Sequence, residues 1–202
     1  MPLVRKPSTP APPAPAASLT GGTPDERWAA ARLAAGKPDG VVVLAAALSH
    51  EQDPRVREAI FTGLSRIATP HSAAAVLPYL RSDDANLRTA AIDALQSMPA
   101  AAAPHLPCLL SDPDADVRLL SCELVRGLPD SEANHLLCEL LEVEVEKNVC
   151  AAAIEVLAEI GRPEALPSLA RCASRFDGDS FMVFSIKVAT DRILEPSRPP
   201  RE

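Results

Sequence analysis

Residues 53–67 read DPRVREAIFTGLSRI, and the spacing of their apolar side chains decides the fold. Five of them follow one spacing, at offsets 0, 3, 4, 8 and 11 counted from Val56. They are Val56, Ala59, Ile60, Leu64 and Ile67. Those offsets trace one face of an α-helix. Asp53 is a favoured N-cap residue, and Pro54 stands where the first turn of a helix tolerates proline. The segment therefore predicts an amphipathic helix that begins directly after Asp53.

The opening of this helix recurs further along the chain. Asp53-Pro-Arg-Val56-Arg57 is followed by Asp84-Ala-Asn-Leu87-Arg88, by Asp114-Ala-Asp-Val117-Arg118 and, more weakly, by Glu146-Lys-Asn-Val149-Cys150. The apolar residues of successive openings are 31, 30 and 32 positions apart. Each starts the same apolar stripe, which only Ser121 interrupts. A period of this length indicates a solenoid of stacked repeats.

A helix breaker and a second apolar segment follow each stripe. The breakers are Pro70, Pro99, Pro129, and Gly161 with Pro163. Proline cannot continue a helix, and glycine ends one readily. Second helices are therefore expected over residues 72–81, 100–110, 131–142 and 163–173. A degenerate first repeat is expected to have helices at 24–33 and 40–48, and a capping helix is expected at 179–194. The prediction is an all-α, right-handed solenoid of antiparallel helix pairs.

The two ends of the chain differ in composition from this region. Residues 1–23 are rich in Pro, Ala, Ser and Thr, which cannot bury enough surface to offset chain entropy. We expect disordered tails at 1–23 and 195–202, and about five repeats plus the cap over 24–194. The P-x-x-P spacing from Pro7 to Pro10 also suits a groove-binding ligand, so the first tail is either a ligand or a linker.

Charge and cysteine content narrow the classes of function. The net charge is −7, and residues 1–23 contain two basic residues and no acids, so the acidity lies in the repeats. That balance argues against nucleic acid and against an anionic membrane as partners. No apolar run approaches the roughly 18 residues of a transmembrane helix. The five cysteines are odd in number and lie in helical patterns, which predicts reduced thiols and a cytoplasmic location.

Two-helix repeats that open with Asp-x-x-Val-Arg resemble HEAT repeats, an armadillo-type fold, and most resemble the short bacterial kind first named for phycobilisome lyases. The resemblance covers residues 24–194. It implies a structural ladder between repeats, formed by Asp53, Asp84 and Asp114 with Arg57, Arg88 and Arg118. The fourth repeat departs from this pattern at Glu146 and Cys150, so a looser joint is expected there.

A solenoid of this kind offers a long rigid surface and no enclosed pocket, which favours a non-catalytic scaffold or adaptor for another protein. No enzyme motif is recognised, and no cofactor is expected. Two alternatives stay open. One is a bilin lyase-like or chromophore-handling enzyme, which the repeat type alone suggests. The other is a HEAT-type DNA glycosylase, which the acidic charge disfavours.

Two H-x-x-C pairs raise the question of a metal site. His105 with Cys108 and His135 with Cys138 each place two ligands on one helix face. Neighbouring helices, however, lie about 8–10 Å apart, which is wide for one tetrahedral centre. Helix packing and capping are the favoured roles, and no metal is expected.

The partner surface is expected on the second helices, which line the concave face in solenoids of this resemblance. Its candidate residues are Tyr79, Arg81, His105, His135, Glu139, Glu142 and Arg171. Glu139, Glu142 and Glu144 predict an acidic end that would steer a basic segment of the partner. The partner's identity and the oligomeric state stay open.

Overall fold

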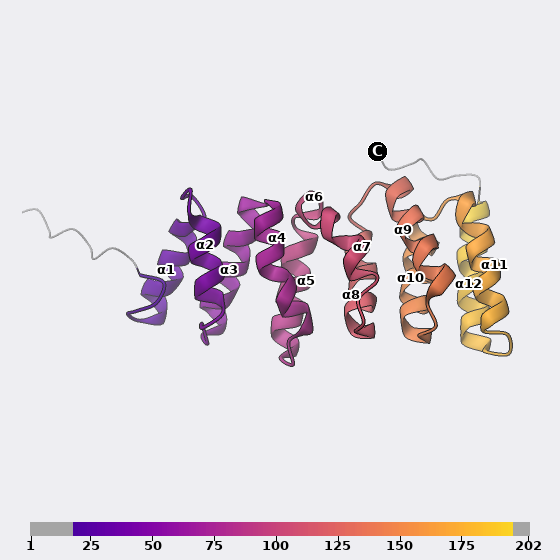
Figure 1. Ribbon diagram of the computed structural model, residues 1–202, viewed down its shortest axis with the longest axis horizontal. Coiled ribbons are helices and arrows are strands. Elements are labelled where there is room, and N and C mark those ends of the chain that lie inside the picture. Colours follow the sequence, from indigo (N-terminus) through magenta and orange to yellow (C-terminus); the bar gives the residue numbers. More distant parts are fainter. Residues whose placement is uncertain (1–17, 196–202) are drawn as a thin grey trace, which may run out of the picture.

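The computed structural model describes residues 18–195. Helical segments make up 76% of this part, which contains no strand. The helices lie side by side in an elongated stack, with α1 at one end and α11 and α12 at the other (Figure 1). None of the described helices is long and apolar enough to cross a membrane. The predicted all-α solenoid is confirmed.

The first helices of the repeats form one layer. Its members are α1 (Pro24–Ala34), α3 (Pro54–Ile67), α5 (Ala85–Gln96), α8 (Ala115–Val125), α10 (Lys147–Ile160) and α12 (Ser180–Leu194). Each packs against the next member along the stack. The starts of α3, α5, α8 and α10 follow the four repeated openings, so the repeat seen in the sequence is also the repeat of the structure.

The second helices form the other layer. They are α2 (Gly40–Leu48), α4 (Pro70–Val76), α6 (Pro99–Ala102), α7 (Leu106–Leu109), α9 (Asp130–Val143) and α11 (Leu166–Arg175). Three short 3-10 segments adjoin these helices, at Leu77–Arg81, Ala103–His105 and Pro163–Ala165. Each segment contains a proline, whose missing N–H prevents continuous α-helical bonding.

The apolar stripes form the core. Val56, Leu64, Leu95, Val117 and Leu157 are fully buried, as the spacing predicted. Ser121 is also buried, and its hydroxyl donates to the carbonyl of Val117 at 2.6 Å. A hydroxyl that bonds back within its own helix needs no further partner, which explains how this one polar residue fits the stripe.

The opening acids cap the first helices. Asp53 Oδ1 accepts from the N–H groups of Arg55 and Val56 at 2.9 and 3.2 Å. Asp84 and Asp114 accept from the N–H two residues on, each at 2.9 Å. These bonds satisfy N–H groups that have no partner within the helix, so each opening fixes where its helix begins.

The segment before α1 differs from expectation. Residues 18–23 were predicted to belong to a disordered tail, yet Leu19 is half-buried against the core, and Gly22 O accepts from Arg27 at 3.0 Å. Thr23 caps α1 in a reciprocal capping box with Glu26. Sequence reasoning extended the tail too far because it overlooked this capping box. The predicted disorder of residues 1–17 and 196–202 lies outside the described residues.

The joint before the fourth copy of the opening, at Glu146, is also tighter than expected. Arg118 of α8 makes two bonds to the Glu144 carboxylate, at 2.6 and 3.0 Å, and Arg126 of α8 pairs with Glu159 of α10. Cys150 Sγ donates to Glu144 O at 3.6 Å. The thiol thus occupies the place that arginine holds in the other repeats, and the expectation of a looser joint was wrong.

Candidate functional site

Each loop between repeats is held by a polar residue two positions before the helix N-cap. Glu51, Asp112 and Glu144 use a carboxylate oxygen to accept the N–H of the N-cap residue, at 2.8, 3.0 and 2.9 Å. Ser82 does the same with its hydroxyl, at 3.2 Å. These four residues close the loops and fix the direction in which the next helix starts.

The arginine of each opening bonds to the same loop. Arg57, Arg88 and Arg118 donate to the carbonyl oxygens of Glu51, Ser82 and Asp112, at 2.7, 2.6 and 2.8 Å. In every case the acceptor lies six residues before the arginine. The arginines therefore have a structural role, which stabilises the loop against its own helix.

The ladder differs from the one that the resemblance implied. Arg57 Nη1 lies 3.5 Å from Asp84 Oδ2, and this ion pair does connect consecutive repeats. The bidentate rungs, however, use Glu51 with Arg27 and Glu144 with Arg118. The N-cap acids Asp53, Asp84 and Asp114 accept hydrogen bonds from the first turns of their own helices. The bidentate pairs with arginine are therefore formed by acids of the loops. The signal in the sequence was an acid two positions before Asp53, Asp114 and Glu146.

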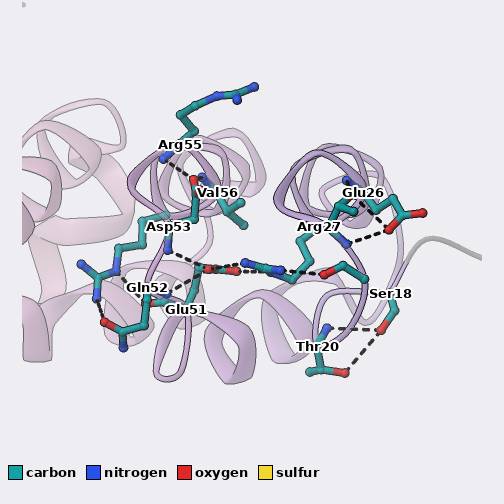
Figure 2. Close-up of polar contacts among 12 residues, drawn as sticks. Ser18, Thr20, Glu26, Arg27, Glu51, Gln52, Asp53, Arg55 and Val56 are labelled. Carbon is teal, nitrogen blue, oxygen red and sulfur yellow. Dashed lines mark hydrogen bonds and ion pairs between the residues drawn. The ribbon is translucent and has the colours of Figure 1, made fainter.

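The carboxylates of Glu51 and Glu144 each accept four hydrogen bonds, two from an arginine and two from the loop backbone. Figure 2 shows the Glu51 carboxylate between the guanidinium of Arg27 on α1 and the backbone at Gln52 and Asp53. Only 4% of the side chain is exposed. The hydrogen bonds from Arg27, with those of the two loop N–H groups, outweigh burial and lower the pKa of Glu51 to about 2. Glu51 thus stays ionised and holds the first repeat to the second.

Three of the candidate partner residues are used inside the solenoid. Tyr79 packs edge-on against Phe61, with the ring centroids 5.7 Å apart. Arg81 pairs with Asp112 in the next loop. His105 is half-buried, with Nε2 3.4 Å from Pro70 O. The contact of Tyr79 lies within one repeat, and those of Arg81 and His105 connect repeats. Arg81 remains 46% exposed, whereas Tyr79 and His105 are half-buried.

The expected acidic end is weaker than the sequence predicted. Glu142 accepts from Arg171 Nε at 2.8 Å and from Ser168 Oγ at 2.6 Å, and these two neighbours lower the pKa of Glu142 to about 2. Glu144 is buried under Arg118. Glu139 remains exposed, with His135 3.4 Å away. Glu139 and Glu142 are exposed as expected, but the predicted acidic end is reduced, because Glu142 and Glu144 bind arginines of the same chain and Glu144 is buried.

An apolar cleft lies beside Glu139 in the second-helix layer. Its walls are formed by Pro107, Leu110, Leu136, Leu140, Val143 and Val145, and its floor by the Arg118–Glu144 pair. Val143 and Val145 are 77% and 71% exposed. Sequence reasoning missed them because they lie at the end of α9 and just after it, outside the repeating stripe. The signal was the alternation of Val143, Glu144 and Val145, which buries the acid and exposes both valines.

The two H-x-x-C pairs do not converge on a shared site. Within residues 18–195 no group of three or more His, Cys, Asp or Glu side chains is placed to hold a metal ion. Cys108 is exposed, and Cys138 is half-buried with Asn134 Nδ2 3.8 Å from its sulfur. The histidines contact Pro70 and Glu139, so each pair serves local packing.

Comparison with solved structures shows the fold. A chain from a study titled as the structural basis of microtubule plus-end tracking by XMAP215, CLIP-170 and EB1 superposes with a TM-score of 0.58 at 15% identity, covering 90% of this chain and 91% of that one. The complex of CpcE and CpcF of phycocyanin lyase from Nostoc sp. PCC7120 gives 0.38 at 17% identity, covering 96% and 100%. A designed armadillo repeat protein gives 0.42 at 15% identity, covering 87% and 96%.

Comparison by sequence places the chain in a family. No curated protein matches it. The family described as HEAT repeats matches residues 13–96 and 102–179, which together are most of the chain. The matched ranges contain the repeated openings, the loop acids and the arginines that bond to them. The chain therefore belongs to the HEAT-repeat family.

Proposed function

We propose that this protein is a non-catalytic adaptor that binds another protein through the cleft between α7 and α9. The observation that carries the proposal is the exposure of Val143 and Val145 beside a recess with apolar walls. Exposed apolar side chains that border a recess are typical of protein-binding sites. Contact with a partner would remove both valines from water and stabilise the complex.

The floor of the cleft is suited to binding rather than to chemistry. Each guanidinium nitrogen of Arg118 already donates, to Glu144 or to the carbonyl of Asp112. A reacting site needs a titratable group that is free to exchange a proton or attack a substrate. The ion pair instead holds α8 and the start of α10 in place, which keeps the recess open for a partner.

Glu139 defines the chemistry of the partner. It lies on the rim of the cleft, and of the three neighbouring acids it is the one without an arginine. A lysine or arginine of the partner would pair with it, while an apolar side chain enters between Val143 and Val145. We propose that the partner segment carries a basic residue close to an apolar one. Because the pair is on the rim, it contributes to the rate of association and to orientation more than to affinity.

Site-specific photocrosslinking tests the proposal. A benzoylphenylalanine placed at Val143 is expected to form one discrete adduct in the cells that naturally express the protein. The matched control places the same group at Val42, which is 72% exposed on α2 of the same layer, and is expected to give no such adduct. Adducts of the same size and yield from both positions, or none from Val143, would contradict the proposal.

A paired substitution tests the same surface without a crosslinker. Changing Val143 and Val145 together to lysine is expected to abolish co-purification of the crosslinked protein while circular dichroism and melting temperature stay unchanged. Glu139→Lys alone is expected to slow association several-fold, and added salt should then no longer slow it further, because salt screens the new repulsion between like charges. Full retention of the partner by the double variant would overturn the assignment of the cleft.

A further inference from the structure

A second recess lies on the first-helix layer, near the end of the solenoid. α10 forms its floor, and α8 and α12 form its walls. The lining residues of α10 include Ala151, Ala152, Glu155 and Ala158, which share one face of the helix. The opposite face carries Val149, Ala153 and Leu157 and is buried in the core. The recess therefore faces away from the cleft between α7 and α9.

The depth of this groove follows from side-chain size. Three alanines lower the floor along α10, while Leu119 rises from α8 and Phe184 from α12. The axes of α8 and α12 are about two helix spacings, or about 18 Å, apart, with the axis of α10 between them. A helix that lies over α10 can therefore pack its side chains between Leu119 and Phe184, as the ridges of one helix pack into the grooves of another.

The groove has an apolar half and a charged half. α10 and α12 run parallel, because Lys147 pairs with Asp179 at their starts and Gly161 lies against Ile193 at their ends. Phe181 and Phe184 stand at the first half and are 55% and 66% exposed.

The charged half follows one to two turns further on. Glu155 is exposed there, and so is Arg192. Neither side chain has a hydrogen bond or an ion pair within the described part of the chain, whereas Glu123 and Glu159 share Arg126. An occupant can therefore gain new charge pairs at Glu155 and Arg192 alone.

The order of these two halves distinguishes the possible occupants. A two-fold contact with a second copy has its axis either along the groove or across it. An axis along the groove would set Glu155 of the two copies against each other, and like charges repel. An axis across the groove would set α12 of one molecule antiparallel to α12 of the other. That arrangement would bring Phe181 and Phe184 onto the partner's charged half and would desolvate Glu155 and Arg192 against aromatic rings. Burying unpaired charges in this way is strongly unfavourable. A helix from a different protein has no such constraint on the order of its residues.

We propose that this groove binds an amphipathic helix of a partner protein. The helix carries two large apolar side chains one turn apart, which pack against Phe181, Phe184 and the alanine floor. A lysine or arginine about one turn further on pairs with Glu155. An acidic residue beyond it faces Arg192. The proposal goes beyond the proposed function, because it adds a second surface on the other layer that can be occupied independently.

A phage-displayed library of helices of about 18 residues, long enough to span α10, provides the probe. Selection on the full-length protein is expected to enrich sequences with two apolar residues at i and i+3 or i+4 and a basic residue one turn on. Phe184→Ser is expected to weaken the selected helices at least about tenfold, as for a residue at the centre of an interface. Selection on Glu155→Lys is expected to enrich an acidic residue at the position where the wild-type protein selects a basic one.

The matched control is Val42→Ser, which removes a similarly exposed apolar side chain, 72% exposed on α2 of the other layer, and should leave the selected helices bound as tightly as before. Sedimentation equilibrium of the wild-type protein is expected to show a monomer across the concentrations used. The proposal is overturned if no helix is enriched, if the enriched helices bind Phe184→Ser unchanged, or if Phe184 supports a dimer. Loss of binding in Val143→Ser would show that the selected helices occupy the cleft between α7 and α9 instead, and would also overturn the proposal.

Discussion

At the scale of single residues, burial distinguishes ion pairs that stabilise the fold from those that contribute little. Glu51 and Glu142 both bind an arginine, and the pKa of each is lowered to about 2. The Glu51 side chain is almost completely buried, whereas that of Glu142 is 39% exposed. Solvent screens the exposed pair, so the same contact stabilises the protein much less there.

Glu51→Gln is expected to lower the free energy of unfolding by about 3 kcal/mol at neutral pH, as for a buried pair that loses one partner. The loss should depend on pH with a defined sign. A carboxyl whose pKa is lower in the folded state stabilises the fold above its unfolded pKa, and this stabilisation disappears as pH falls. The difference between wild type and variant should therefore be constant above about pH 5 and shrink between pH 4.5 and 2.

Urea denaturation at a series of pH values measures this effect. Glu142→Gln is the matched control, since its carboxylate also binds arginine but at the surface. Its destabilisation should be clearly smaller at every pH. Equal destabilisation by the two substitutions would contradict the assignment of Glu51 as the buried link between the first two repeats.

Cysteine reactivity gives a second prediction at this scale. Cys108 is exposed, whereas Cys122 is buried, and burial raises the pKa of Cys122 to about 12. Only a thiolate reacts rapidly with a disulfide reagent. Under native conditions we expect Cys108 to react first with dithionitrobenzoate and Cys122 to stay protected until the protein unfolds. Cys108→Ser should remove the fast phase, and persistence of that phase would contradict the burial pattern.

The candidate site was less predictable than the caps. Asp53, Asp84 and Asp114 follow a local rule, because an N-cap bonds within its own helix. The partner of an arginine depends on which loop lies opposite it, and sequence spacing does not contain that information. For this reason the sequence alone did not show that Glu142 and Glu144 form ion pairs with Arg171 and Arg118, which lie across from them in the folded chain.

At the scale of helices, the caps determine where each repeat starts. Asp53→Ala removes bonds to two N–H groups and is expected to cost about 1 kcal/mol of stability. Asp53→Asn keeps an acceptor oxygen and should cost much less. Asp39→Ala is the matched control, because Asp39 stands before α2 without a side-chain cap bond. Thermal denaturation of the three variants checks the order, and an equal loss for Asp39→Ala would contradict the capping role.

Most helix positions could be predicted because each depends on a short stretch of sequence. The stripes, the breaks and the final helix at Ser180–Leu194 all follow from spacing and proline. The division of one second helix into α6, a 3-10 segment and α7 could also be traced to Pro104 and Pro107. What spacing could not predict is how firmly neighbouring repeats are joined, since that depends on pairs from different repeats.

At the scale of the whole molecule, the joints between repeats are unequal. The ion pair of Glu51 connects the loop before α3 to α1. The ion pair of Glu144 connects the loop before α10 to α8, and Arg126 adds a further pair between α8 and α10. Between α5 and α8 themselves the described structure contains no side-chain hydrogen bond or ion pair, although the two helices are in contact. The loop before α8 is held to the preceding repeats by Asp112 with Arg81, whose side chain is 46% exposed, so this pair contributes less than the buried ones. The adjoining second helices, α6 and α7, are also the shortest. In a solenoid each repeat is stabilised mainly by its neighbours, so the weakest joint divides the chain into two cooperative units.

Val117→Asp tests this division. Val117 is fully buried in α8, and an aspartate there would be an unpaired buried charge that costs about 3 kcal/mol or more. The loss should reach α10 through the firm joint at Glu144 and reach α3 weakly through the joint at α5. Native-state hydrogen exchange is expected to show a large loss of amide protection from α8 to α12 and a small loss from α1 to α3. Val56→Asp, which buries the same charge in α3, should show the reverse order. If both variants lose protection evenly along the whole chain, the solenoid unfolds as one unit, and the joint between α5 and α8 is as strong as the others.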